Sequence, residues 1–170
     1  MTRYIALLRA VNVGGTGKLP MSDLRAICTE AGFARVETYI ASGNVLFESK
    51  AATSKVKAEL EARLLAYAGK PIDVVLRTAA EMSAVLKANP FAKAETRHTY
   101  AIFLNEPPPP DALARVAGQQ DEQMRLGKRE IFVCYPTGMG RSKLRIPAAK
   151  MGTARNMNTV AKLVELASKA

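Results

Sequence analysis

The order of apolar patterns in the first 78 residues is the feature that most limits how this chain folds. Four short apolar runs with the character of strands lie at residues 3–8, 36–40, 45–48 and 72–77. Two amphipathic helical patterns lie between them, at residues 20–31 and 55–68. Taken along the chain, they predict strand, helix, strand, strand, helix, strand, which is the split β-α-β unit of ferredoxin-like folds. We therefore expect a mainly antiparallel sheet with helices packed on one face.

The remaining residues follow the same plan less completely. A capping box, Thr78-x-x-Glu81, starts a short third helix that ends near Asn89-Pro90. Beyond it we expect a strand, a helix capped by Asp111, a hairpin, a glycine-rich basic loop and a closing helix, at residues 99–104, 111–118, 124–135, 136–151 and 153–168. The prediction is an α/β (α+β) protein of two ferredoxin-like halves, residues 1–90 and 91–170, in one compact unit that ends in a C-terminal helix.

Composition excludes several classes of protein. No apolar run reaches the roughly 20 residues that span a bilayer, and the N-terminus lacks a signal-peptide pattern, so we expect a cytoplasmic protein. Cys28 and Cys134 both lie in apolar patterns and are predicted to be buried free thiols. Because His98 is the single histidine, no Cys/His cluster is available for a zinc site, and we predict no bound metal.

The formal net charge of +10 is concentrated near the C-terminus. Residues 1–124 hold 15 Lys and Arg against 13 Asp and Glu, whereas residues 125–170 hold 10 Lys and Arg against only Glu130 and Glu165. A basic C-terminal quarter favours an acidic partner, which is a nucleic acid, a phosphorylated metabolite or an anionic surface. The alternative interpretation is a solvated face that keeps the protein soluble.

A glycine-rich loop that ends in a lysine follows the first strand. Asn12, Gly14, Gly15 and Lys18 form a candidate cradle for a phosphate or a carboxylate, because backbone amides beside an ammonium group attract anions. A nucleotide-binding P-loop is excluded, since that motif needs glycine at position 12 and Ser or Thr at position 19, where this chain has Asn12 and Leu19. The alternative is that the glycines only permit a tight turn.

The predicted topology gives this loop a neighbour. Because the first two strands run in the same direction, the loops at residues 12–18, 42–44 and 69–70 are expected at one end of the sheet. Ser42 and Asn44 would then join the candidate site, with Lys18 and Lys70 between the loops. The alternative is a turn whose side chains bond their own backbone. A serine nucleophile is excluded, because no histidine is placed to act as its base.

A second candidate group lies in the basic C-terminal quarter. Arg141 and Lys143 lie in a glycine-flanked loop, and Arg155 and Asn158 are expected on one polar face of the closing helix. A cation at a helix N-terminus opposes the helix dipole, which indicates a bound anion. The alternative is that Asn156 and Asn158 cap the helix. No aromatic RNA-binding pattern and no tryptophan is present, so base stacking on this chain is not predicted.

These motifs together resemble a widespread bacterial family, the domain of unknown function numbered sixteen ninety-seven. The resemblance is carried by R-A-V-N-V-G-G at residues 9–15, P-M-S-D-L at 20–24, T-Y-I-A-S-G-N-V-L-F at 38–47, N-P-F at 89–91, G-M-G-R-S-K-L at 138–144 and T-A-R-N-M-N-T-V-A-K-L at 153–163. It implies an α/β pair of ferredoxin-like subdomains and no activity. One departure is Met157, where the family commonly has tryptophan.

The sequence leads to one functional hypothesis and two alternatives, and it leaves open whether the protein is an enzyme. The first is a protein that binds a small anionic ligand, phosphorylated or carboxylate, through one or both candidate groups. One alternative is a nucleic-acid-binding module that uses the basic C-terminal quarter, and the other is a protein-interaction or assembly domain. No metal or nucleotide cofactor motif is present, and no membrane partner is expected.

Overall fold

The computed structural model describes residues 1–12, 18–40 and 42–169 of the chain. They form two units, one of residues 1–82 together with the stretch from Leu163 onward, and one of residues 83–162. The division at residue 90 that the sequence indicated stays a prediction.

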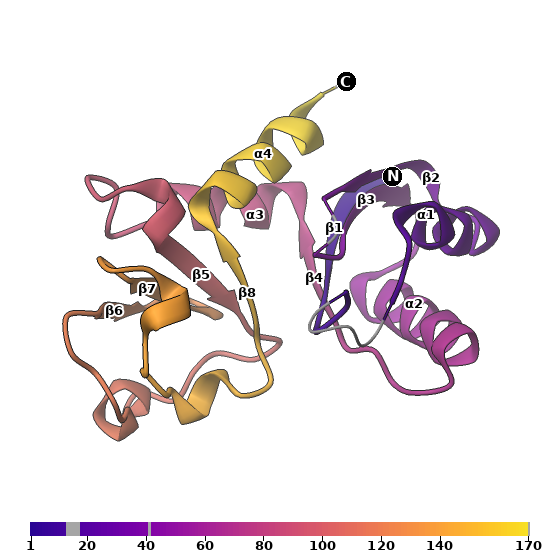
Figure 1. Ribbon diagram of the computed structural model, residues 1–170. Coiled ribbons are helices and arrows are strands. Elements are labelled where there is room, and N and C mark those ends of the chain that lie inside the picture. The colour runs from indigo at the N-terminus through magenta and orange to yellow at the C-terminus, as the bar shows by residue number, and fades with distance from the viewer. Residues whose placement is uncertain (13–17, 41, 170) are drawn as a thin grey trace. The chain divides into compact units, whose positions relative to one another are not determined.

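The first unit is the predicted ferredoxin-like unit. Its strands are β1 (Thr2–Leu8), β2 (Ala34–Tyr39), β3 (Asn44–Ser49) and β4 (Val74–Thr78), which form an antiparallel sheet in the order β2-β3-β1-β4. The helices α1 (Met21–Glu30) and α2 (Thr53–Ala68) lie on one side of this sheet (Figure 1). The order of elements and the single helical layer confirm the predicted fold.

Every second residue along the strands of this unit points toward the helices and contributes to the core. Tyr4, Ala6 and Leu8 alternate along β1 and pack with buried residues of both helices, such as Leu24 and Leu60. At the centre, the ring of Phe47 stacks on Phe33 with centroids 4.2 Å apart, and Tyr4 lies 5.9 Å from it at a tilt. The aromatic cluster fastens β1 and β3 to the start of β2.

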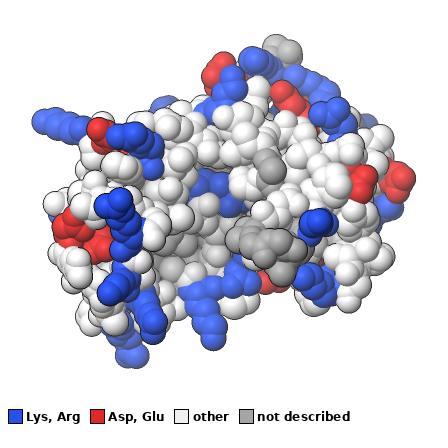
Figure 2. Space-filling model, in the orientation of Figure 1, with Lys and Arg blue, Asp and Glu red and all other residues white. Residues whose placement is uncertain are grey.

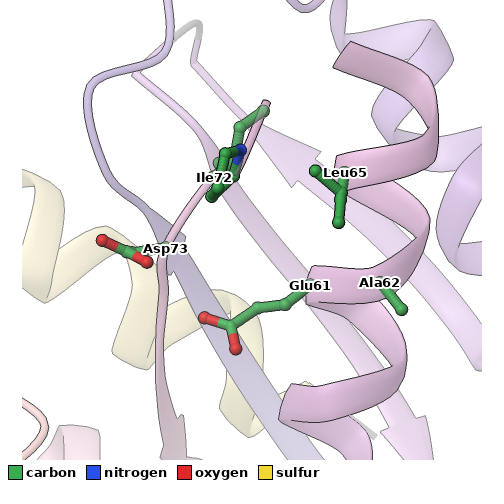
Figure 3. Close-up of a pocket in the computed structure, with 6 residues that line it drawn as sticks. Glu61, Ala62, Leu65, Ile72 and Asp73 are labelled. Atoms are coloured by element: carbon green, nitrogen blue, oxygen red, sulfur yellow. The ribbon is translucent and has the colours of Figure 1, made fainter. Parts of the chain in front are cut away.

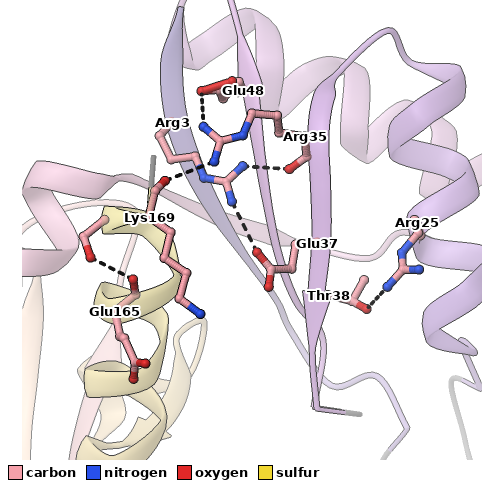
Figure 4. A network of polar contacts seen from close by, with 9 residues as sticks. Arg3, Arg25, Arg35, Glu37, Thr38, Glu48, Glu165 and Lys169 are labelled. Atoms are coloured by element: carbon pink, nitrogen blue, oxygen red, sulfur yellow. Dashed lines mark hydrogen bonds and ion pairs between the residues drawn. The ribbon is translucent and has the colours of Figure 1, made fainter.

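A network of charged groups lies on the strands of the same unit (Figure 4). Arg3 donates to the carbonyl oxygen of Arg35 at 2.7 Å and pairs with Glu37 at 3.5 Å. Arg35 pairs with Glu48 at 3.2 Å and donates to the carbonyl of Lys169 at 3.0 Å. Arg35 has a φ of 50°, where the pairing of β2 with β3 shifts register, so its long side chain reaches partners on both sides.

The second unit repeats the sheet with shorter connections. Its strands are β5 (Thr99–Phe103), β6 (Gln123–Leu126), β7 (Glu130–Cys134) and β8 (Thr153–Asn156), in the antiparallel order β6-β7-β5-β8. This order corresponds strand for strand to that of the first unit. Helix α3 (Ala79–Lys87) precedes β5 and begins at the predicted capping box, because Thr78 and Glu81 bond each other's backbone amides at 2.9 and 3.1 Å.

Two helix predictions for this half are wrong. The expected helix at 111–118 is a single 3-10 turn, Ala112–Arg115, because Ala117 pairs instead with the backbone of Arg145. The closing helix, α4 (Met157–Ser168), starts four residues later than expected, because Thr153–Asn156 pairs with β5 as β8. Asn156 caps α4, since its side-chain oxygen accepts from the Thr159 amide at 2.9 Å, as the alternative interpretation of this residue expected.

The loop at residues 136–151 covers one face of the second sheet. It contains two 3-10 turns, Met139–Arg141 and Pro147–Ala149. Leu144 and Ile146 pack against the core that Ile102, Ile131 and Val133 form, beside Ala154 of β8. Apolar side chains of an irregular loop thus take the place of a helix.

Glu122 fastens this loop to the rest of the unit. Its carboxylate accepts from the Ser142 hydroxyl at 2.5 Å and from the Gln120 amide at 2.6 Å. The Ser142 hydroxyl oxygen in turn accepts from the Leu144 amide at 3.1 Å. The hydrogen bond from Ser142, followed by that from Gln120, lowers the pKa of Glu122 below its usual value.

We expect this contact to make stability depend on pH in the acid range. A carboxyl whose pKa is lower in the folded state stabilises the fold above its unfolded pKa, and the contribution is lost as the pH falls through the folded pKa. The excess free energy of unfolding of the wild type over Glu122→Gln should therefore shrink as urea unfolding is repeated at falling pH. Glu106→Gln, at an exposed position, is the control. Identical pH profiles for the wild type and Glu122→Gln would contradict this role.

Both cysteines are buried and free, as predicted, and burial raises the pKa of the Cys28 thiol to about 12. Within the described ranges, no helix is both long and apolar enough to cross a membrane.

Candidate functional site

The described parts of the β1–α1, β2–β3 and α2–β4 connections lie at one end of the first unit's sheet. Because β1 is antiparallel to β3 and β4, and β2 is antiparallel to β3, the ends of β1 and β2 lie beside the starts of β3 and β4. Backbone hydrogen bonds join them directly, from the Leu8 amide to the Gly43 oxygen at 2.8 Å and from the Arg9 amide to the Asp73 oxygen at 3.0 Å. We call this place the loop end; its described residues are 9–12, 18–20, 42–44 and 69–73. The described ends of the three loops therefore lie at the same end of the sheet, as predicted.

The backbone at the loop end is tightly packed and strained. Gly43 has a φ of +89°, and a Cβ there would lie 2.6 Å from a methyl group of Val11. Ala10 and Asn12 are also left-handed, with φ of 56° and 55°, and so is Ile40, directly after β2, with a φ of 48°. Such angles are unfavourable for residues with a Cβ, most of all for β-branched isoleucine, and they concentrate at functional sites.

Two asparagines of the candidate group hold the turns in shape. The Asn12 side chain accepts from the Leu19 amide at 2.7 Å and donates to the Leu19 oxygen at 2.9 Å, so it ties the two ends of its loop together. Asn44 is fully buried and donates to the Tyr39 oxygen at 2.9 Å and to the Ser42 hydroxyl at 3.0 Å. This second arrangement is the self-bonded turn that we considered as an alternative. Gly14 and Gly15 lie outside the described residues.

Three of the side chains at the loop end are basic: Arg9, Lys18 and Lys70. Lys18 is exposed and directly precedes Leu19, whose backbone bonds the Asn12 side chain. Arg9 is partly exposed, and its guanidinium lies 3.9 Å from the Asp73 carboxylate. Lys70 is exposed on the third connection. Sequence reasoning did not single out Arg9, although its place directly after the first strand was a usable signal.

A small pocket lies beside the loop end, between α2 and the segment that leads into β4 (Figure 3). Its volume is about 210 Å³, and it is lined by Glu61, Ala62, Leu65, Pro71, Ile72 and Asp73. Glu61 is already engaged, because it accepts from the Val74 amide at 2.9 Å and from Lys57 at 2.8 Å. Two carboxylates in the lining make this pocket unfavourable for an anion.

The C-terminal candidate residues do not form one group. Arg155 follows Ala154 on β8, so the two side chains point to opposite faces of the sheet. Leu144 packs on the face of Ala154. Arg155 is buried and donates to the Thr153 hydroxyl at 2.7 Å and to the Ala154 carbonyl at 2.9 Å, and burial lowers its pKa to about 10. Arg155 therefore lies neither on a helix nor beside Arg141 and Lys143, contrary to the helical face that the sequence suggested.

The other residues around the start of α4 have structural partners. The Asn158 side-chain oxygen accepts from the Thr96 hydroxyl at 2.5 Å. Met157 is 1% exposed, so the methionine is a buried apolar residue. No group of three or more potential metal ligands occurs among the described residues.

Comparisons with known proteins show the family and the fold of the chain. The family model described as "Protein of unknown function (DUF1697)" matches residues 1–132, and the chain belongs to this family of α/β proteins. Residues 138–163, which carry two of the motifs quoted above, lie beyond the matched range. The chain is also similar to the structure of conserved bacterial protein SP0830 from Streptococcus pneumoniae, at 26% identity over 98% of this chain and 99% of that one, with a TM-score of 0.82. None of the curated proteins matches the chain.

Proposed function

We propose that this chain is a cytoplasmic protein that binds a small anionic ligand, phosphorylated or carboxylate, at the loop end of the first unit. The proposal is supported chiefly by the convergence there of Arg9, Lys18 and Lys70 on connections that backbone hydrogen bonds hold together. Cations of this kind bind phosphate and carboxylate through charge-assisted hydrogen bonds. Neither a reaction nor a cofactor is part of the proposal.

The roles within the site differ. Lys18 contacts the anion, and Arg9 joins it by exchanging its 3.9 Å pair with Asp73 for a shorter bond to the ligand. The Ser42 hydroxyl lies at the same end of the sheet and orients the ligand. Asn12 and Asn44 act as positioning residues, because their amide groups hold the first two connections in the shape that presents these side chains.

A thermal-shift screen tests the proposal. Inorganic phosphate, sugar phosphates, nucleotides and dicarboxylates are added to the full chain, and at least one is expected to raise the melting temperature. A ligand at a hundred times its dissociation constant stabilises by about 2.7 kcal/mol, which corresponds to roughly 5–10 °C for a chain of this size. The site is then mapped with Lys18→Ala, which should weaken binding of the hit about 10- to 100-fold, since a hydrogen bond to a charged group is lost.

Lys55→Ala is the matched control, because Lys55 is an equally exposed lysine of the first unit at the start of α2, away from the loop end. The affinity of Lys55→Ala for the ligand found in the screen should equal that of the wild type. The proposal is wrong if no anion raises the melting temperature, or if Lys18→Ala and Lys55→Ala lose the same affinity.

A further inference from the structure

Arg141 ends the 3-10 turn Met139–Arg141, and from Arg141 to Ile146 the side chains alternate between exposed and partly buried. Arg141, Lys143 and Arg145 are exposed, whereas Ser142, Leu144 and Ile146 are partly buried, with the two apolar side chains on the core of the unit. The backbone is extended at Ser142 and at Ile146. We call Arg141, Lys143 and Arg145 the cationic strip.

Contacts with Ala117, Gly118 and Glu122 fix the backbone of the cationic strip. The backbones of Ala117 and Arg145 exchange two hydrogen bonds, of 3.0 and 2.8 Å. Gly118 lies so close under the strip that a Cβ there would be 2.2 Å from the Lys143 oxygen. The Ser142 hydroxyl is fixed by Glu122. The three cations therefore project from a backbone that is already ordered, so little conformational entropy is lost when a ligand orders them further.

The electrostatic surroundings leave the strip positive. Residues 83–162 contain 13 Lys and Arg against 6 Asp and Glu. The Glu122 carboxylate, which accepts from Ser142 between the strip residues, is one negative charge beside the three cations. Within the described part of the chain, none of the three strip side chains forms an ion pair or a side-chain hydrogen bond. Lys and Arg also cover more than Asp and Glu on the molecular face that Figure 2 displays.

We infer that the cationic strip binds the phosphate backbone of single-stranded nucleic acid. In an extended segment, alternate side chains are about 6.6 Å apart, a repeat that suits successive phosphates of an extended strand. Contacts to phosphates position a strand without reading its bases. Because the strip contacts phosphates and not base edges, the binding is independent of nucleotide sequence and depends strongly on salt.

The same features favour a nucleic acid over other polyanions. A membrane surface is bound through apolar side chains that enter the lipid beside the cations, but Leu144 and Ile146 point into the protein. An acidic protein partner needs a central apolar or aromatic anchor in a pocket, and a row of three separated cations offers none. A flexible strand needs only a line of charges, which is what this segment presents.

The inference is tested by fluorescence anisotropy with a labelled single-stranded oligonucleotide of about 16 nucleotides, at the upper end of the sites that single-strand binding folds cover. Three phosphate contacts predict that the logarithm of the association constant falls with the logarithm of salt concentration at a slope of about −2. Lys143→Ala should reduce that slope by about 0.7. Replacement of all three strip residues by Gln should lower affinity at least tenfold at low salt.

The matched control replaces Lys87, Lys93 and Arg97 by Gln, which removes the same charge from exposed positions of the same unit. Circular dichroism melting of each variant verifies that it is folded. Equal losses in the two triple variants, no binding by the wild type at low salt, or equally tight binding to vesicles of anionic lipid would each overturn the inference. The strip variants should leave the thermal shift by a small anion unchanged, which separates this surface from the loop end.

Discussion

Replacing Phe47 by Ala is expected to lower the free energy of unfolding by about 3–5 kcal/mol, the usual loss for a buried aromatic residue. Phe47 is fully buried on β3 and stacks on Phe33 at a centroid distance of 4.2 Å. The aromatic contact adds about 0.5–1.5 kcal/mol to the lost burial. Because whole domains are stable by only about 5–15 kcal/mol, this variant should be near the limit of folding. Urea unfolding followed by circular dichroism measures the loss.

Two further variants show whether the loss comes from the packed aromatic ring. Phe47→Leu keeps most of the apolar volume and should lose clearly less than the alanine variant. Leu65→Ala, at a side chain that is 48% exposed, should change stability by no more than about 0.5 kcal/mol. If Phe47→Ala were as stable as Leu65→Ala, the core would not be centred on this ring.

The fold of the first unit was predictable because its signals are local. Apolar spacing distinguishes strands from helices, and the Thr78–Glu81 capping box is visible as two residue types three positions apart. Gly69, which ends α2 with a φ of 73°, is an equally clear local signal in the sequence. The strand order then follows from the ferredoxin-like plan, and with it the meeting of the three connections at the loop end.

The errors in the second unit come from interactions between residues far apart in the chain. In Thr-Ala-Arg-Asn at residues 153–156 only Thr153 favours a strand, and the segment is β8 because β5 pairs with it. Ala117 likewise leaves the expected helix because Arg145 offers backbone partners. The sequence pattern of the closing helix was extended too far toward the N-terminus, which placed Arg155 on that helix instead of on β8. The predicted helical face that includes Arg155 therefore does not form.

The features of the candidate sites also differ in whether the local sequence reveals them or residues far apart in the chain determine them. That the cations Lys18 and Lys143 are exposed follows from ordinary polarity, and both were named from the sequence. The role of Asn12 was not predictable, because its amide group closes a loop on Leu19, seven residues away. Nor was the role of Gly118, whose close approach to the Lys143 oxygen depends on how two separate segments cross.

Gly118→Ala is expected to weaken both the fold and the cationic strip without changing any charge. Gly118 has a φ of +72°, and the added Cβ would overlap the Lys143 carbonyl oxygen at 2.2 Å, so backbone must move. The left-handed angle costs about 1–2 kcal/mol and the overlap about 1–3 kcal/mol more, so urea unfolding should register a loss of about 2–5 kcal/mol. Gly32→Ala is the control, since Gly32 has a φ of +87° at the end of α1 but open space around it, and should show the cost of the left-handed angle alone.

The same pair of variants tests whether the strip acts through its geometry. Moving the Lys143 backbone displaces the middle cation of the row, so we expect Gly118→Ala, assayed below its melting temperature, to bind the labelled oligonucleotide several-fold more weakly than Gly32→Ala. Net charge is identical in the two proteins, and long-range attraction is therefore unchanged. If both variants bind as the wild type does, charge alone accounts for the affinity, and the ordered row of cations over Gly118 has no part in it.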